Sequence, residues 1–76
     1  MSPRLPAVTA KDLARIATKL GFELDRQIES HAVYRRASDG GRVVIPMHSG
    51  RTLRPKTLTG ILDDLGITVE QLRELL

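Results

Sequence analysis

The sequence contains no cysteine and no tryptophan, and its aromatic residues are one tyrosine and one phenylalanine. Without cysteine the chain has no disulfide, no cysteine-ligated zinc and no thiol nucleophile. Small secreted domains usually depend on such cross-links, so their absence favours a reducing cytoplasm.

Long hydrophobic runs are also missing. No stretch approaches the roughly 18 apolar residues of a membrane-spanning helix, and residues 1–6 carry no apolar segment of signal-peptide length. We therefore expect a cytoplasmic protein with no membrane partner. A chain of 76 residues is expected to form a single domain over 1–76, with 1–8 as a flexible N-terminus. A domain this small has a thin core, so any active site is shallow and uses few residues.

Charge is distributed unevenly, although its net value is only +3. Residues 1–56 contain eleven Lys and Arg against five Asp and Glu, whereas residues 57–76 contain one Arg against four acids. A basic field of this kind suits a polyanion such as nucleic acid, and the alternative is a solvated surface. The segment 35–56 is the most basic and has Asp39 as its one acid beside Arg35, Arg36, Arg42, Arg51, Arg54 and Lys56.

Hydrophobic residues at helical spacing predict three helices. The first spans about residues 10–20, with a capping-box pattern at Thr9 and Asp12 and a stop at Gly21. The second begins at Pro55 and ends at Gly66, and a short last helix opens at the capping-box pattern of Thr68 and Gln71.

After the first helix the pattern becomes alternating, which is typical of strands. Residues 22–29 predict a half-exposed strand, residues 30–36 a second strand, and residues 42–45 a third that ends at Pro46. Residues 38–41 (Ser-Asp-Gly-Gly) have turn composition and join the last two strands as a hairpin.

This order predicts an α+β fold, an α-β-β-β-α two-layer sandwich. A three-stranded antiparallel sheet carries two helices on one face, a short C-terminal helix follows, and the other face stays open. The pattern by itself carries no function.

Two histidines, His31 and His48, are the acid–base candidates near neutral pH. His31 begins the second predicted strand, where alternation leaves Ser30 on the opposite face and argues against a Ser–His dyad. A histidine near arginines suits phosphodiester cleavage, because imidazole moves a proton, guanidinium stabilises charge on phosphate, and RNA supplies its own 2′-hydroxyl. The alternative is a structural histidine. The sequence does not decide on which face of the hairpin the His31 side chain lies.

The other candidates concern binding. His48 either grips RNA, serves as a second acid–base group, or is a loop histidine bonded to local backbone. Tyr34 either stacks on an unpaired base or packs in the core. The six basic residues of segment 35–56 are RNA-binding candidates, and three of them cluster near the second helix, whose N-terminus attracts phosphate. No glycine-rich phosphate loop or zinc-ligand spacing occurs, so we expect no metal and no cofactor.

Nearly the whole chain, about residues 9–75, carries short motifs whose order and spacing are more specific than any one of them. With these motifs the chain resembles the HicA family of toxin mRNA interferases, small basic proteins of bacterial and archaeal toxin–antitoxin pairs. The motifs are Leu20-Gly21-Phe22, Arg26-Gln27, Ser30-His31, Tyr34-Arg35, Val43-Val44-Ile45-Pro46 with His48 and Gly50, Leu53, Thr57-Leu58, Ile61-Leu62 and Leu65-Gly66-Ile67.

The resemblance implies a fold similar to a double-stranded-RNA-binding domain and ribosome-independent cleavage of mRNA, which inhibits translation and growth. It also implies that His31 is the single catalytic histidine of a metal-independent endoribonuclease. The implied partners are RNA and a HicB-type antitoxin protein, which covers the site and joins in repressing the shared operon.

Two positions depart from the family pattern. Glu29 stands where the family has glycine before Ser-His, and Pro55 stands where it often has lysine. If Glu29 shares a face with His31, its carboxylate favours protonated imidazole and repels phosphate; otherwise it is solvated and turned away. Glu29 and Ser30 are therefore candidate modulators of activity. The alternatives to an enzyme are a non-catalytic RNA-binding module and a module that binds an acidic antitoxin-like protein.

Overall fold

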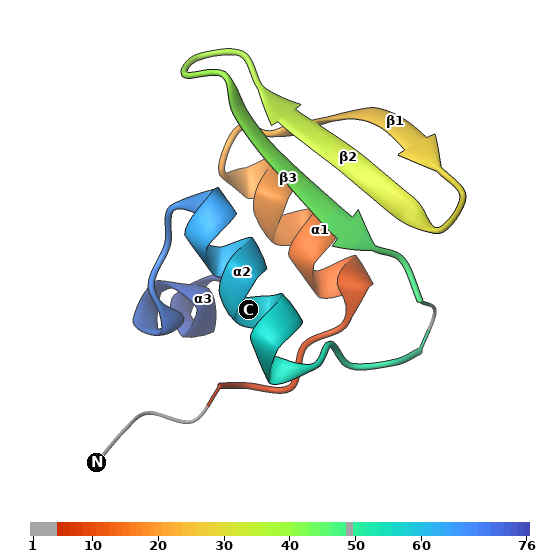
Figure 1. The fold of residues 1–76 in the computed structure, drawn as a ribbon. Coiled ribbons are helices and arrows are strands. Elements are labelled where there is room, and N and C mark those ends of the chain that lie inside the picture. Colours follow the sequence, from red (N-terminus) through yellow and green to blue (C-terminus); the bar gives the residue numbers. More distant parts are fainter. Residues whose placement is uncertain (1–4, 49) are drawn as a thin grey trace.

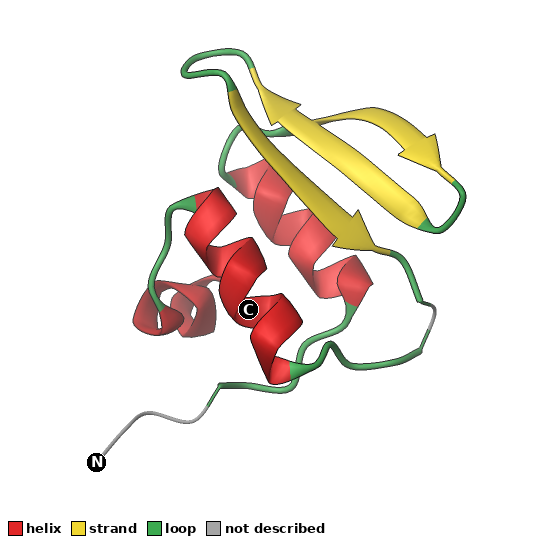
Figure 2. Ribbon diagram, in the orientation of Figure 1, coloured by secondary structure: helices red, strands yellow, loops and turns green. Residues whose placement is uncertain are grey.

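The computed structural model describes residues 5–48 and 50–76. The elements form two layers, with the strands on one side and the helices on the other (Figures 1 and 2). This confirms the predicted α+β arrangement. In chain order the elements are α1 (Ala10–Lys19), β1 (Glu23–Ile28), β2 (His31–Arg36), β3 (Gly41–Pro46), α2 (Pro55–Leu65) and α3 (Val69–Leu75).

The helix ends follow the local sequence. At the start of α1 the Thr9 hydroxyl accepts from the Asp12 N–H at 3.2 Å, and the Asp12 carboxylate accepts from the Thr9 N–H at 3.0 Å. Thr68 and Gln71 form the same capping box before α3. Gly66 ends α2 with φ +76°, a left-handed conformation that glycine adopts without steric cost. The predicted caps are therefore confirmed.

The three strands form one antiparallel sheet in the order β1-β2-β3. The turn between β1 and β2 contains Glu29 and Ser30, because Ile28 pairs directly with His31. The second strand therefore begins one residue later than predicted. At this same end of β2, on the side away from β1, His31 pairs with Pro46 of β3.

The hydrophobic core lies between the helices and one face of the sheet. Ala32 and Tyr34 of β2 belong to it, so alternation places His31, Val33 and Arg35 on the opposite, open face. Among the described residues, the contacts between helices and sheet concentrate on β3. The other main members of the core are Leu13, Ile16, Ala17, Phe22, Val43, Ile45, Leu58, Ile61, Leu62, Leu65 and Leu72.

The prediction of a half-exposed first strand is wrong. All six residues of β1 are exposed, and Leu24 and Ile28 each retain 55% of their surface. A bulge at Asp25 interrupts the alternation, so Leu24 lies on the side of Tyr34 whereas Arg26 lies on the side of Val33. The physical reason is position: β1 is the edge strand farthest from β3, and the helices do not cover it (Figure 1).

The segment before α1 packs against the fold. Val8 has no exposed surface, and Leu5 packs against the core. The Leu53 N–H donates to the Val8 carbonyl at 2.9 Å, and Thr9 forms a β-bridge with Thr52. Within the segment 1–8, expected to be flexible, residues 1–4 lie outside the described residues. In the described part of the chain, no helix is long and apolar enough to cross a bilayer.

Candidate functional site

His31 lies in a surface groove at the end of the sheet where β2 begins and β3 ends. The side chain is exposed, and the groove has a volume of about 460 Å³. His48, Arg51 and Arg54 line the same groove, so four of the predicted site residues come together here. The remaining lining residues are Pro46, Thr52, Leu53 and Thr57.

Backbone pairing beyond the strand ends places His48 beside His31. The Met47 N–H donates to the Ser30 carbonyl, which continues the pairing of β2 with β3 by one residue. Met47 packs against the core, and His48, the next residue, lines the groove together with His31 and Pro46. The backbone carbonyl of Ser30 thus contacts the residue that precedes His48.

Two further contacts hold the loop that carries the arginines. The Arg51 N–H donates to the His48 carbonyl at 3.2 Å, and Leu53 is bonded to the segment before α1 as described above. Arg54 is the N-cap residue of α2. Both arginines are therefore attached to fixed backbone on the rim of the groove.

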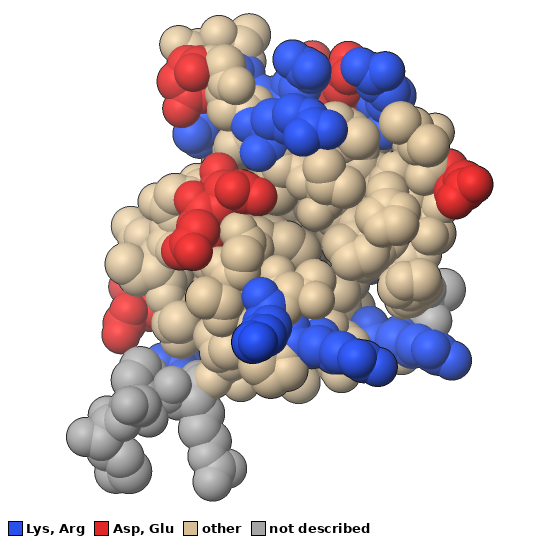
Figure 3. Space-filling model, in the orientation of Figure 1, with Lys and Arg blue, Asp and Glu red and all other residues tan. Residues whose placement is uncertain are grey.

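The groove is electropositive. None of its lining residues is acidic, and neither Arg51 nor Arg54 forms an ion pair within the described part of the chain. No side chain caps α2, and its first turn has no acid, so the partial positive charge of the helix start is not neutralised locally. Lys56 is exposed in this first turn but does not line the groove. Figure 3 shows basic side chains along the lower edge, where α2 begins.

Arg35 and Arg42 lie away from the groove. They are direct partners on β2 and β3. Arg35 lies four residues along β2 from His31, and Arg42 lies four residues along β3 from Pro46, the partner of His31, a separation of about 13 Å along a strand. The Arg35 Nε lies 3.4 Å from the Asp25 carboxylate, whereas Arg42 has no ion pair among residues 5–48 and 50–76. Figure 3 shows a second group of basic side chains at the upper edge of the molecule.

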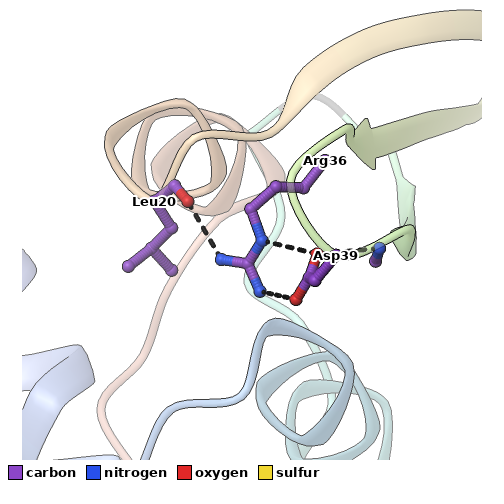
Figure 4. A network of polar contacts seen from close by, with 4 residues as sticks. Leu20, Arg36 and Asp39 are labelled. Atoms are coloured by element: carbon purple, nitrogen blue, oxygen red, sulfur yellow. Dashed lines mark hydrogen bonds and ion pairs between the residues drawn. The ribbon is translucent and has the colours of Figure 1, made fainter.

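The Arg36 side chain is bonded to Leu20 and Asp39 of its own fold (Figure 4). Its guanidinium donates to both carboxylate oxygens of Asp39, at 3.0 and 2.8 Å, and to the Leu20 carbonyl at 3.0 Å. The guanidinium carbon also lies 4.4 Å from the centre of the Phe22 ring. These contacts tie the β2–β3 hairpin to the end of α1. They also hold the pKa of Asp39 at about 2, because the Arg36 hydrogen bonds and the Gly41 N–H favour the carboxylate.

Asp39→Asn is expected to lower stability in a pH-dependent way. The folded-state pKa of about 2 lies below the ordinary value of 3.8, so the carboxylate contributes stability above pH 4 that is lost as pH falls towards 2. Urea midpoints of wild type and variant should differ at pH 6 and converge near pH 2. A difference that stays constant over this range would contradict the role assigned to the Arg36–Asp39 pair.

Tyr34 is also separate from the groove. It is 9% exposed and belongs to the hydrophobic core on the helix side of the sheet. This position matches the packing alternative and leaves little ring surface for stacking on a base.

Glu29 lies in the β1–β2 turn rather than in a strand. Its φ is +55°, the one positive value among the non-glycine residues that the structure describes. Its side chain is exposed and forms no ion pair with His31 in that part of the chain. A left-handed turn position explains why glycine suits this place, because glycine adopts a positive φ at little steric cost.

Glu29→Gly is expected to stabilise the protein by about 1 kcal/mol, because a left-handed residue with a Cβ costs about 1–2 kcal/mol and glycine relieves most of it. Glu29→Ala is the matched control, since it removes the carboxylate but keeps the Cβ. Urea unfolding should show the gain for glycine alone. Equal midpoints for the two variants would show that charge, not backbone conformation, governs this position.

The groove also contains residues that sequence analysis did not select as site residues. Thr57 lies three positions after Arg54 in the first turn of α2, and Thr52 and Leu53 carry no acid–base or charged group, so the path of the loop brings them here. Pro46 was named as the end of a strand and as part of a family motif, not as a site residue. Among residues 5–48 and 50–76, no three His, Asp or Glu side chains gather as metal ligands do.

Comparison with protein families matches most of the chain to a known family. The family described as the HicA toxin of bacterial toxin–antitoxin systems matches residues 10–67, which run from the start of α1 past the end of α2. No curated protein matches the chain.

Proposed function

Because the chain belongs to the HicA family of toxins from bacterial toxin–antitoxin pairs, we propose that it is an endoribonuclease that cleaves mRNA in the groove containing His31. Cleavage of mRNA inhibits translation and growth. The observation that carries this proposal is that His31 shares an open groove with Arg51 and Arg54, without any acidic lining residue.

In the proposed reaction the RNA 2′-oxygen attacks the adjacent phosphorus and the bond to the 5′-oxygen breaks. The products end in a 2′,3′-cyclic phosphate and a 5′-hydroxyl. His31 moves a proton at the reacting oxygens, and Arg51 and Arg54 stabilise the charge that develops on the phosphate. All reacting groups come from protein side chains and from RNA itself.

The rest of the RNA is proposed to follow basic residues outside the groove. Lys56 is exposed next to the groove, and Arg42 is exposed on the open face at the far end of the sheet. Arg35 contributes more weakly because Asp25 already pairs with it. Membership in a toxin–antitoxin family implies an antitoxin partner. We propose that this is a HicB-type protein that covers the groove in the cytoplasm.

Incubation of purified protein with end-labelled RNA in excess chelator tests the proposal. We expect shortened RNA that carries a 2′,3′-cyclic phosphate, and no cleavage of the same sequence with 2′-O-methyl groups. A gel shift without shortening would instead support a non-catalytic RNA-binding module. No affinity for RNA at about 150 mM salt, together with one-to-one binding of an acidic protein, would support an interaction module.

A further inference from the structure

The groove brings together the two histidines of the chain, which are seventeen positions apart in sequence. His31 is the first residue of β2, and His48 follows the residue that is bonded to the Ser30 carbonyl. Both side chains are exposed. The groove therefore exposes both imidazoles to any phosphate bound within it.

RNA transphosphorylation needs two proton transfers. One group takes the proton from the 2′-hydroxyl as the new oxygen–phosphorus bond forms, and another gives a proton to the 5′-oxygen as the old bond breaks. Apart from the histidines, the lining residues of the groove are proline, arginine, threonine and leucine. None of these side chains exchanges a proton near neutral pH, so among the described lining residues His48 is the one that can complement His31.

We propose that His48 is a second catalytic residue, which exchanges a proton with one reacting oxygen while His31 serves the other. This inference rests on the proposed endoribonuclease function and extends it from one acid–base group to a pair. One imidazole is neutral and the other protonated at the start, and their protonation states are exchanged at the end. The two proton transfers therefore balance without any further reactant.

His48→Gln tests the proposal. The variant keeps the backbone carbonyl that accepts from the Arg51 N–H, so this contact of the loop is unchanged. We expect kcat to fall by about 10²–10⁴-fold with little change in KM, and the bell-shaped pH profile of wild type to lose one limb. Arg51→Gln is the matched control in the same loop: the cleavage rate falls because phosphate charge is less stabilised, but both limbs of the pH profile remain. If His48→Gln raises KM but keeps both limbs, His48 only grips RNA and the proposal is overturned.

A substrate with sulfur in place of the 5′-bridging oxygen provides the second readout. A thiolate leaves without protonation, so whichever histidine is the acid becomes dispensable. We expect this RNA to restore the rate of one variant, His31→Ala or His48→Gln, and not the other. If the sulfur-containing RNA restores the rate of neither variant, the histidine pair is overturned and the endoribonuclease proposal still stands. Wild type that cleaves neither RNA overturns the proposed function itself.

Discussion

His31→Ala is expected to lower the rate of RNA cleavage by about 10²–10⁴-fold, the usual contribution of a general acid–base group. The variant removes the imidazole from the groove while leaving Arg51 and Arg54 to hold phosphate. RNA affinity should therefore stay close to that of wild type. Single-turnover cleavage of labelled RNA separates the lost chemistry from retained binding.

Growth provides an independent measure of the same substitution. Expression of wild type without antitoxin should slow growth, and His31→Ala should relieve it. Because His31 is exposed, its loss should leave the melting temperature unchanged. Arg35→Ala, on the same face of β2 but outside the groove, is the matched control; it removes only a weak RNA contact, because Asp25 already pairs with Arg35, and should stay toxic. Equal toxicity of wild type and His31→Ala would contradict the catalytic assignment.

Phe22→Ala is expected to remove most of the stability. Phe22 is 1% exposed and packs in the core, and the Arg36 guanidinium lies over its ring. Truncation of a buried phenylalanine costs about 3–5 kcal/mol. A domain of this length is stable by only roughly 4–11 kcal/mol. A large fraction of the variant should therefore be unfolded at 37 °C.

Urea unfolding followed by circular dichroism measures this effect. Leu24→Ala is the matched control, because this leucine is near Phe22 in sequence but 55% exposed on β1. Its loss should change stability by no more than about 0.5 kcal/mol. Similar losses for the two variants would show that β1 is covered in solution, contrary to the exposure of its six residues.

Local patterns predicted most of the fold correctly, because each depends on residues a few positions apart. The capping box of Thr9 and Asp12 needs only a three-residue spacing, and Gly66 ends α2 through its own backbone freedom. The half-exposed first strand was wrong for a related reason. Alternation indicates a strand, but burial depends on which helices reach it, and β1 lies beyond them.

For the candidate site too, local sequence features predicted one part and the tertiary structure determined another. Residue chemistry and charge pointed to His31 and the basic segment, and these assignments remain predictions until cleavage is measured. The six basic residues nevertheless separate in space. Arg51 and Arg54 line the groove, while Arg36 is held by Asp39 and Leu20. Charge counted along a chain does not distinguish an arginine that binds a ligand from one that binds its own fold.

The sequence by itself determined the order of helices and strands, the caps, the excess of positive charge and the presence of two histidines, since these are local or compositional properties. Only the tertiary structure decided that His31 faces the open side of the sheet, that His48 joins it, and that Glu29 occupies a left-handed turn. The physical reason is that these outcomes depend on strand register and on backbone bonds such as Met47 to Ser30, which join distant residues. The missing cysteines leave a site whose proposed chemistry needs no more than imidazole and guanidinium.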